Sequence, residues 1–323
     1  MPDSIRRIAL ILAAALLLNQ CGRADVERLE KLLRIRGPWA WDSVNIEGPD
    51  IFRLPNFPFV GEHAPIRIKT LRMRTGVDSA KAFLALPPED IFPGKRPAVI
   101  VLHGHLSHPD ELVALSTSVN LWSVGALLAS RGFVVLAPEI RWEPQNLKNE
   151  IRQTFQLLLS GRIITGERTA DVLRAADFLA RHPRVDARRL GILGWSMGGQ
   201  IALYAAALEP ALRAVYISAS FAPYAILLHP DAPLQSPDNY VPFLLSDFGD
   251  KDQIAALIKP RPILIEHGEQ DPTESFEGVD HMANQLALHY GRHGQERLSF
   301  IRHRFDHRFY GADAVEWFER WLK

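Results

Sequence analysis

The sequence predicts an α/β protein built on one mostly parallel sheet that is covered by helices on both faces. Short apolar runs with the length of buried strands recur along the chain, and segments whose apolar residues have helical spacing stand between them. At 323 residues the chain is also long enough to bury one large core, and α/β folds often use this size for a single domain.

The first elements form a lead-in to this sheet. Residues Ala24–Arg36 alternate charged residues with leucines at helical spacing, which indicates an amphipathic helix packed on the body. Pro38–Pro65 is rich in proline and aromatic residues and shows no clear period. Ile66–Arg74 and Ala80–Leu86 then read as two antiparallel strands joined by a short turn.

A regular rhythm of strands and helices follows. The predicted strands are Pro97–Leu102, Phe133–Ala137, Leu190–Leu193, Ala214–Ser218, Pro262–Glu266 and Leu298–Arg302. The predicted helices are Leu112–Ser130, Glu167–Arg181, Gln200–Leu208 and Ala312–Leu322. Right-handed connections place such helices on both faces of a parallel sheet. Sites in sheets of this kind lie at the carboxyl ends of the strands.

One turn between a strand and a helix carries a chemical signature. After Leu190–Leu193 the chain reads Gly194-Trp195-Ser196-Met197-Gly198, which is G-x-S-x-G, and it then enters the helix Gln200–Leu208. This pattern puts a serine on a sharp turn, where small residues two before and two after it avoid collisions between strand and helix. The context predicts Ser196 as an exposed nucleophile rather than part of an ordinary turn.

The order of these parts resembles the α/β-hydrolase fold over nearly the whole chain after Ile66. Asp177-Phe178-Leu179 and Arg184-Val185-Asp186, which lead into Gly194–Gly199, look especially like the dienelactone hydrolase, acetyl-xylan esterase and prolyl-oligopeptidase branch. The resemblance implies a serine hydrolase whose triad follows in the order serine, acid, histidine. It says little of the substrate, because the branch covers many chemistries.

The resemblance also implies the two partners of the serine, which needs a base oriented by a carboxylate. Asp271 matches the family's aspartate followed by proline, and Glu269 is the alternative acid. In the loop after the last strand, His307 matches the family's His-x-Phe pattern, and His303 is the alternative histidine. A neutral imidazole can take the serine proton and later return it to the leaving group.

Negative charge on the attacked carbonyl oxygen requires fixed N–H donors. One predicted donor is the backbone N–H of Met197, at the amino end of the helix after the serine, where the helix dipole also helps. By resemblance to the family's His-Gly-x loop, the backbone N–H of His105 is the other, and the side chain of His103 braces this loop. Trp195, beside the serine, is either core packing or a wall of the substrate pocket.

A metal site is an alternative for the same loop. His103-Gly104-His105-Leu106-Ser107-His108 approximates the His-x-His-x-Asp-His zinc motif of metallo-β-lactamase-like hydrolases. Ser107 stands where that motif requires an aspartate, and a zinc site leaves the G-x-S-x-G pattern unexplained. The prediction is therefore an enzyme that needs no metal and no other cofactor.

A long interval, Phe221–Leu257, separates the strands Ala214–Ser218 and Pro262–Glu266, and it holds several aromatic residues among prolines. Insertions at this point commonly form a cap in the family that the chain resembles, so residues 221–257 are predicted to cover the site. The alternative is an ordinary helix and loop packed on the body.

The N-terminus has the pattern of an export signal. Arg6 and Arg7 precede the apolar run Ile8–Leu18, whose length fits a signal-peptide core of about 7–15 residues and falls short of the ~20 that span a bilayer. Cys21 is the only cysteine, and Leu18-Asn19-Gln20-Cys21 resembles a bacterial lipoprotein signal, although Gln20 stands where a small residue is usual.

The chain is therefore expected to divide into a signal peptide (1–21), a lead-in (22–65) and a catalytic domain (66–323). We expect an exported protein that a lipid on Cys21 holds to a bacterial membrane, on its periplasmic side or at the cell surface. A soluble secreted form and an uncleaved membrane anchor are the alternatives.

The balance of charges narrows the function further. The chain carries 37 basic and 37 acidic residues without a block of five basic ones, which argues against a nucleic-acid partner. The prediction is a serine esterase that cleaves a small-molecule ester through an acyl-enzyme. One alternative is a serine peptidase acting on short peptides, although the chain lacks room for the propeller domain that is typical of oligopeptidases. The other alternative is a catalytically idle binding module.

Overall fold

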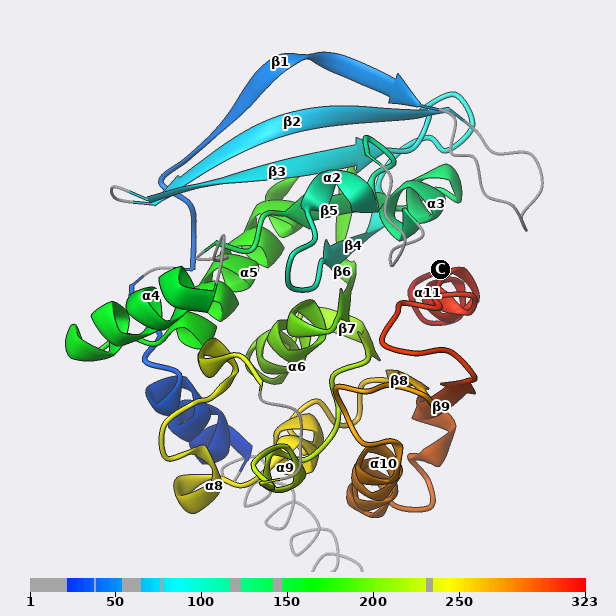
Figure 1. Ribbon diagram of the computed structural model, residues 1–323. Coiled ribbons are helices and arrows are strands. Elements are labelled where there is room, and N and C mark those ends of the chain that lie inside the picture. Colours follow the sequence, from blue (N-terminus) through cyan, green and yellow to red (C-terminus); the bar gives the residue numbers. More distant parts are fainter. Residues whose placement is uncertain are drawn as a thin grey trace, which may run out of the picture.

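The computed structural model describes residues 22–37, 39–53, 65–75, 78–116, 123–141, 147–230 and 235–323. Its centre is a nine-stranded sheet with the order β1-β2-β3-β5-β4-β6-β7-β8-β9 (Figure 1). The strands are β1 (Ser43–Arg53), β2 (Ile66–Thr75), β3 (Asp78–Leu86), β4 (Arg96–Leu102), β5 (Val134–Pro138), β6 (Val185–Trp195), β7 (Leu212–Ser218), β8 (Ile263–Gly268) and β9 (Leu298–His303). The predicted α/β class with a mostly parallel sheet is confirmed.

The sheet is parallel from β5 through β9, and β1 to β3 extend it as an antiparallel edge. The helices are α2 (Pro109–Leu112), α3 (Val124–Ser130), α4 (Leu147–Leu159), α5 (Ile164–Arg181), α6 (Met197–Leu208), α7 (Tyr224–Leu227), α8 (Leu244–Asp247), α9 (Lys251–Ala256), α10 (Phe276–Tyr290) and α11 (Ala314–Leu322). Residues 22–32 are also helical.

Both faces of the central strands are buried, and successive residues serve opposite faces because side chains alternate along a strand. In β4, Ala98, Ile100 and Leu102 belong to the core under α5, α6 and α10, whereas Val99 and Val101 belong to the core under α3 and α11. Continuous apolar runs are what such strands require.

The helix predicted over Leu112–Ser130 is wrong. The structure has the single turn α2 and, after an interval, the short helix α3. Ala114 adopts φ 61°, a left-handed conformation that does not continue an α-helix. The apolar pattern misled because residues of both helices, such as Leu112, Val124 and Leu128, are buried in the same core.

The lead-in contains more structure than its sequence indicates. The amphipathic helix predicted over Ala24–Arg36 is present over residues 22–32 and ends before the left-handed Arg34, at φ 55°. Leu29 of this helix and Leu33 just after it are fully buried against the body. The segment without a clear period contains the strand β1, most of whose residues are exposed. The helices α4 and α10 are further elements that the sequence analysis did not predict.

The predicted signal peptide and Cys21 lie outside the described residues, so their assignment stays a prediction. Within the described part of the chain, no helix has the length and hydrophobicity needed to cross a bilayer.

Candidate active site

The turn that carries Ser196 is built as its pattern predicts. Ser196 lies between β6 and α6 with φ 53° and ψ −123°, a conformation that side chains rarely adopt and that concentrates at functional sites. A Cβ atom at Gly194 would lie 2.0 Å from the carbonyl oxygen of Gly198, and one at Gly198 would lie 2.5 Å from the carbonyl oxygen of His103. Only glycine fits these two positions without moving the backbone.

The structure brings together the serine, the acid and the histidine that the sequence analysis selected. Ser196 Oγ lies 2.8 Å from His307 Nε2, and His307 Nδ1 lies 2.7 Å from Asp271 Oδ2. Because the aspartate is fully buried and can only accept when ionised, Nδ1 carries the proton and Nε2 is left to accept the serine hydroxyl. This is the arrangement that a general base requires.

Thr273 is a member of this network that sequence reasoning missed. Its hydroxyl lies 2.7 Å from Asp271 Oδ1 and 2.7 Å from His307 Nδ1. Asp271 Oδ1 also accepts the backbone N–H groups of Thr273 and Glu274, at 2.8 and 3.2 Å. The local signal was the sequence Asp-Pro-Thr, because an aspartate often bonds the backbone two residues on.

The contact between Asp271 and His307 favours the charged form of the histidine, which burial disfavours. Burial lowers the pKa of His307, but the hydrogen bond and charge of Asp271 outweigh it, so that this pKa is raised above its usual 6.5. Burial raises the pKa of Asp271, and the hydrogen bond and charge of His307, with bonds from Thr273, bring it below its usual 3.8. The aspartate therefore stabilises the imidazolium that proton transfer creates.

Neither alternative residue lies at the serine. The Glu269 side chain is exposed. His303, at the end of β9, is buried, its Nδ1 accepts the Phe305 N–H at 3.3 Å, and its ring packs against those of Phe305 and Tyr310. Burial lowers the pKa of His303. The structure thus places it beneath the loop that carries His307.

The loops bearing acid and histidine leave the sheet at the same level. In the pairing of β8 with β9, Gly268 lies opposite His303. Just before these ends, the fully buried Glu266 accepts the hydroxyls of Tyr216 and Ser218 and the backbone N–H groups of Tyr310 and Gly311. The Glu266 carboxylate thereby ties strand β7 and the segment after β9 to strand β8.

Both residues predicted to supply oxyanion donors lie beside the serine. Met197 is the first residue of α6, where a backbone N–H has no acceptor within the helix. The loop after β4 packs on the turn, since a Cβ atom at Gly104 would lie 3.1 Å from Ser196 Cβ, and His105 lines the same pocket as Ser196.

His103 is fixed within the loop, as predicted. Its Nδ1 lies 2.9 Å from the carbonyl oxygen of Gly104, and its Nε2 accepts the N–H of Ile140 at 3.1 Å. Burial lowers the pKa of His103 to about 4, so it is neutral near pH 7. With both ring nitrogens occupied, His103 is not placed as a zinc ligand, and the described residues contain no group of three His, Cys, Asp or Glu side chains arranged to hold a metal ion.

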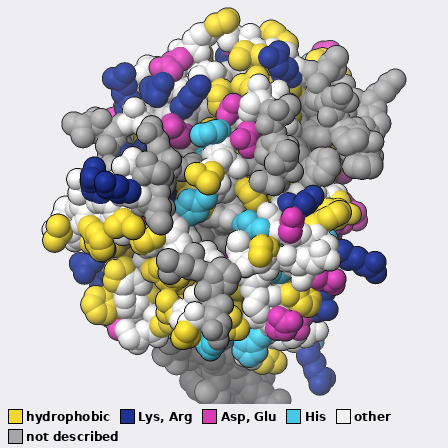
Figure 2. All heavy atoms as spheres, viewed as in Figure 1, with side chains coloured by type: hydrophobic (Ala, Val, Ile, Leu, Met, Phe, Trp, Pro, Cys, Tyr) yellow, Lys and Arg dark blue, Asp and Glu magenta, His cyan; other side chains and the backbone are white. Residues whose placement is uncertain are grey.

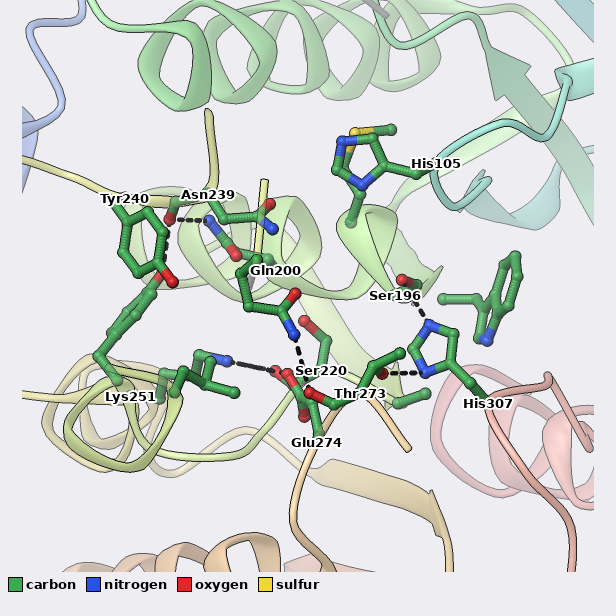
Figure 3. Close-up of a pocket in the computed structure, with 16 residues that line it drawn as sticks. His105, Ser196, Gln200, Ser220, Asn239, Tyr240, Lys251, Thr273, Glu274 and His307 are labelled. Atoms are coloured by element: carbon green, nitrogen blue, oxygen red, sulfur yellow. Dashed lines mark hydrogen bonds and ion pairs between the residues drawn. The ribbon is translucent and has the colours of Figure 1, made fainter. Parts of the chain in front are cut away.

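The side chain of His105 belongs to a second ion-pair network. Its Nε2 lies 3.4 Å from Asp238 Oδ2, and the same carboxylate oxygen accepts a hydrogen bond from the buried Arg168. Burial raises the pKa of Asp238, but the charge of Arg168 and the contact with His105 lower it well below its usual range. Figure 3 shows Ser196 between the rings of His105 and His307.

These side chains surround a pocket of about 240 Å³ (Figure 3). Trp195 lines it, is buried, and packs its ring 5.4 Å from that of His307, so it fills both roles that the sequence left open. The remaining lining comprises His105, Met197, Gln200, Ala219, Ser220, Tyr224, Leu227, Gln235, Asn239, Tyr240, Lys251, Thr273 and Glu274.

The wall away from the serine contains a buried ion pair that sequence reasoning did not find. Lys251 Nζ lies 3.4 Å from Glu274 Oε1 and 3.3 Å from the carbonyl oxygen of Ser220. Glu274 Oε2 accepts the N–H groups of Phe221 and Ala222, at 2.8 and 2.9 Å. Polar groups at this depth give the pocket a mixed character.

The interval 221–257, predicted as a cap, supplies Tyr224, Leu227, Tyr240 and Lys251 to the pocket wall. The same interval packs into the main core through Leu244 and Ile254. Its role as a cap stays a prediction.

The sheet order and the serine turn at the carboxyl end of β6 define the class: this is an α/β-hydrolase fold. The family model described as "Dienelactone hydrolase family" matches residues 80–305, more than half of the sequence. The chain belongs to the dienelactone hydrolase family, and it is a hydrolase.

The chain is also similar to individual proteins. The chain is 27% identical over 290 residues to YtaP of Bacillus subtilis (strain 168), a match that covers 81% of this chain and 94% of YtaP. Acetyl xylan esterase 1 from Thermoanaerobacterium sp. JW/SL YS485 has a TM-score of 0.58 and 18% identity, covering 93% of each chain. A glucuronoyl esterase from Solibacter usitatus has a TM-score of 0.63 and 15% identity, covering 91% of this chain and 90% of its own. At these identities the two structures attest the fold.

Proposed function

We propose that the protein is a serine esterase that cleaves a carboxylic ester through an acyl-enzyme. The observation that carries the proposal is the continuous hydrogen-bonded chain from Ser196 through His307 to the buried Asp271, which opens on a pocket. The names of the similar structures, an acetyl xylan esterase and a glucuronoyl esterase, support an ester as the substrate.

In the first half-reaction, Ser196 Oγ attacks the ester carbonyl carbon while its proton passes to His307 Nε2. The carbonyl oxygen becomes an oxyanion, which the N–H groups of Met197 and His105 stabilise in this proposal. The bond from carbon to the alcohol oxygen then breaks, and Nε2 returns the proton to that oxygen. Asp271 holds Nδ1–H throughout and favours the transient imidazolium.

In the second half-reaction, a water molecule gives its proton to Nε2 as its oxygen attacks the acyl carbon. The bond to Ser196 Oγ breaks, the serine recovers its proton from Nε2, and the carboxylic acid leaves. Water thus supplies the elements that the products gain, and no other reactant is required.

The size of the pocket predicts a preference for short acyl groups. A pocket of about 240 Å³ has no room for a long chain, so kcat/KM on p-nitrophenyl acetate or butyrate is expected to exceed that on the palmitate ester by at least about tenfold. Measuring the purified protein on a graded ester series, beside a peptide p-nitroanilide, tests the function. Faster turnover of palmitate would indicate a lipase, and cleavage of the anilide alone would indicate a peptidase.

We further propose that a lipid on Cys21 anchors the enzyme to a membrane after export. Cys21→Ser is expected to release the protein into the soluble fraction when membranes are washed at high salt, or to block its processing, because two or three acyl chains hold a protein firmly and none remains. Fractionation and intact mass spectrometry report the result, and Lys95→Ser, an exposed substitution elsewhere, is the control. Membrane association that survives the high-salt wash unchanged, at the unmodified mass, would contradict lipidation.

A further inference from the structure

One face of the molecule exposes large apolar side chains beside the N-terminal helix. On α4, Leu159 is 91% and Phe155 59% exposed, and Phe243, just before α8, is 69% exposed. Hydrophobic side chains gather over α4 at the left edge of Figure 2, and Figure 1 shows the helix of residues 22–32 beside α4 and α8. Exposed apolar groups that gather on one face mark interaction sites, whereas scattered ones need no explanation.

The apolar side chains line two adjoining grooves. Ile151, Phe155 and Leu158 of α4 line one of about 610 Å³, and Leu158 also lines a second of about 730 Å³ together with Phe243. Phe243 sits at φ 65°, in the left-handed region that a bulky residue adopts only under strain. The backbone thus maintains an unfavourable conformation while presenting an aromatic ring to solvent.

The second groove has a basic rim. Arg28, Lys31, Arg34 and Arg36 line it, and all four are exposed. Within the described part of the chain, none of these four side chains is in an ion pair, whereas Arg162, which also lines the groove, is paired with Glu167. The single acidic residue of the lining is Asp247. The groove is therefore positive although the whole chain has no net charge.

We propose that this face, which comprises the basic rim and the exposed side chains of α4 and Phe243, docks on the surface of an anionic phospholipid bilayer. The cationic side chains of the rim contact the lipid headgroups, and the exposed apolar side chains of α4 and Phe243 enter the boundary of the acyl region, as in interfacial membrane binding. The basic rim, from Arg28 to Arg36, lies a short distance after the apolar run Ile8–Leu18 and Cys21 in sequence. The docking does not depend on lipid attached to Cys21 or on the esterase activity.

The test exploits the single cysteine of the chain. In a full-length Cys21→Ser background, a new cysteine at Leu159, Phe243 or the control Leu288 is labelled with the environment-sensitive dye NBD. Leu288 is 74% exposed on α10 and lines neither groove. The protein is reconstituted in vesicles of phosphatidylcholine, either alone or with 30 mol% phosphatidylglycerol. The phosphatidylglycerol supplies the anionic surface that the experiment tests.

At positions 159 and 243 the dye is expected to shift to the blue and to be quenched by doxyl-labelled lipid in the anionic vesicles, and to do so less in phosphatidylcholine alone. At position 288 it should remain water-like in both. Raising NaCl from 0.1 to 0.5 M should reverse the response, since exposed charges are screened. The salt step needs no further variant and so is independent of any folding defect.

Charge reversal supplies a second arm. Arg28→Glu/Lys31→Glu/Arg34→Glu is expected to lower the docked population about tenfold or more in anionic vesicles. Lys95→Glu/Arg292→Glu/Arg304→Glu makes the same change in net charge at exposed sites outside the grooves and should leave docking unchanged. Circular dichroism checks that both variants fold.

Three results would overturn the proposal. These are an equal response at 159, 243 and 288, a response that ignores phosphatidylglycerol and salt, and a response that rises with the protein-to-lipid ratio. The last would identify a second copy of the chain as the occupant of the face.

Discussion

His307→Ala is expected to lower kcat by about 10⁴-fold or more while the protein remains folded, because loss of a triad member removes most of the acceleration. The ring of His307 bridges Ser196 Oγ and Asp271 Oδ2 at 2.8 and 2.7 Å. Without it, no base takes the serine proton. Steady-state hydrolysis of p-nitrophenyl acetate, with a thermal melt for folding, measures the effect.

His303→Ala is the matched control, since it removes an imidazole from the same region that does not bond Ser196. It should keep most of kcat and lower Tm instead, because the His303 ring is buried against Phe305 and Tyr310. A fluorophosphonate probe should label the wild-type protein and His303→Ala at Ser196 but label His307→Ala far more slowly. If His307→Ala and His303→Ala both lower kcat only mildly and both are still labelled, the assignment of the triad is wrong.

Asp271→Asn is expected to lower kcat by about 10⁴-fold at pH 7, the effect of the equivalent change in a well-studied triad. The amide is nearly isosteric, so packing is kept, but its NH₂ group can donate to Nδ1. The histidine would then adopt the tautomer with the proton on Nε2, which cannot accept from Ser196.

The pH profile separates this effect from a loss of fold. In the wild type, kcat falls as pH drops through the pKa of His307, which the hydrogen bond and charge of Asp271 raise above its usual value. Removing that charge lowers the pKa, so the residual activity of Asp271→Asn should have its acid limb displaced to lower pH. Thr273→Val offers a milder comparison, because it removes a hydroxyl from the network and leaves the charge. An acid limb that does not move would refute the assigned role of Asp271.

The parts of the fold that could be predicted from sequence are those where burial dictates residue type. Strands β4 and β6 are covered on both faces, which forces continuous apolar runs that are visible in the sequence. Strand β1 is mostly exposed and is defined by pairing with β2, so it carries no apolar period. The error over 112–130 has the opposite cause, because two short helices that share one core imitate a long one.

The site divides in the same way. Ser196 was visible because the turn needs glycine on both sides, and Asp271 and His307 were reached through resemblance to a family pattern. The pairing of Lys251 with Glu274, and of His105 with Asp238, joins residues far apart in the chain. Nothing in the local sequence of either partner announces such contacts.

The loops that carry Asp271 and His307 leave β8 and β9 at the same level of the sheet, and hydrogen bonds to Glu266 hold these strand ends together. This arrangement has a consequence for protein engineering. The spacing of the acid–base pair is set by strand register before any pocket residue is chosen. Much of the opposite wall, from Gln235 to Lys251, arises from a separate segment of the chain. A library confined to that wall, with Asp238 and Lys251 kept because they pair with His105 and Glu274, is therefore expected to change which ester is accepted while it leaves the proton-transfer machinery in register, so selectivity and turnover can be optimised one after the other.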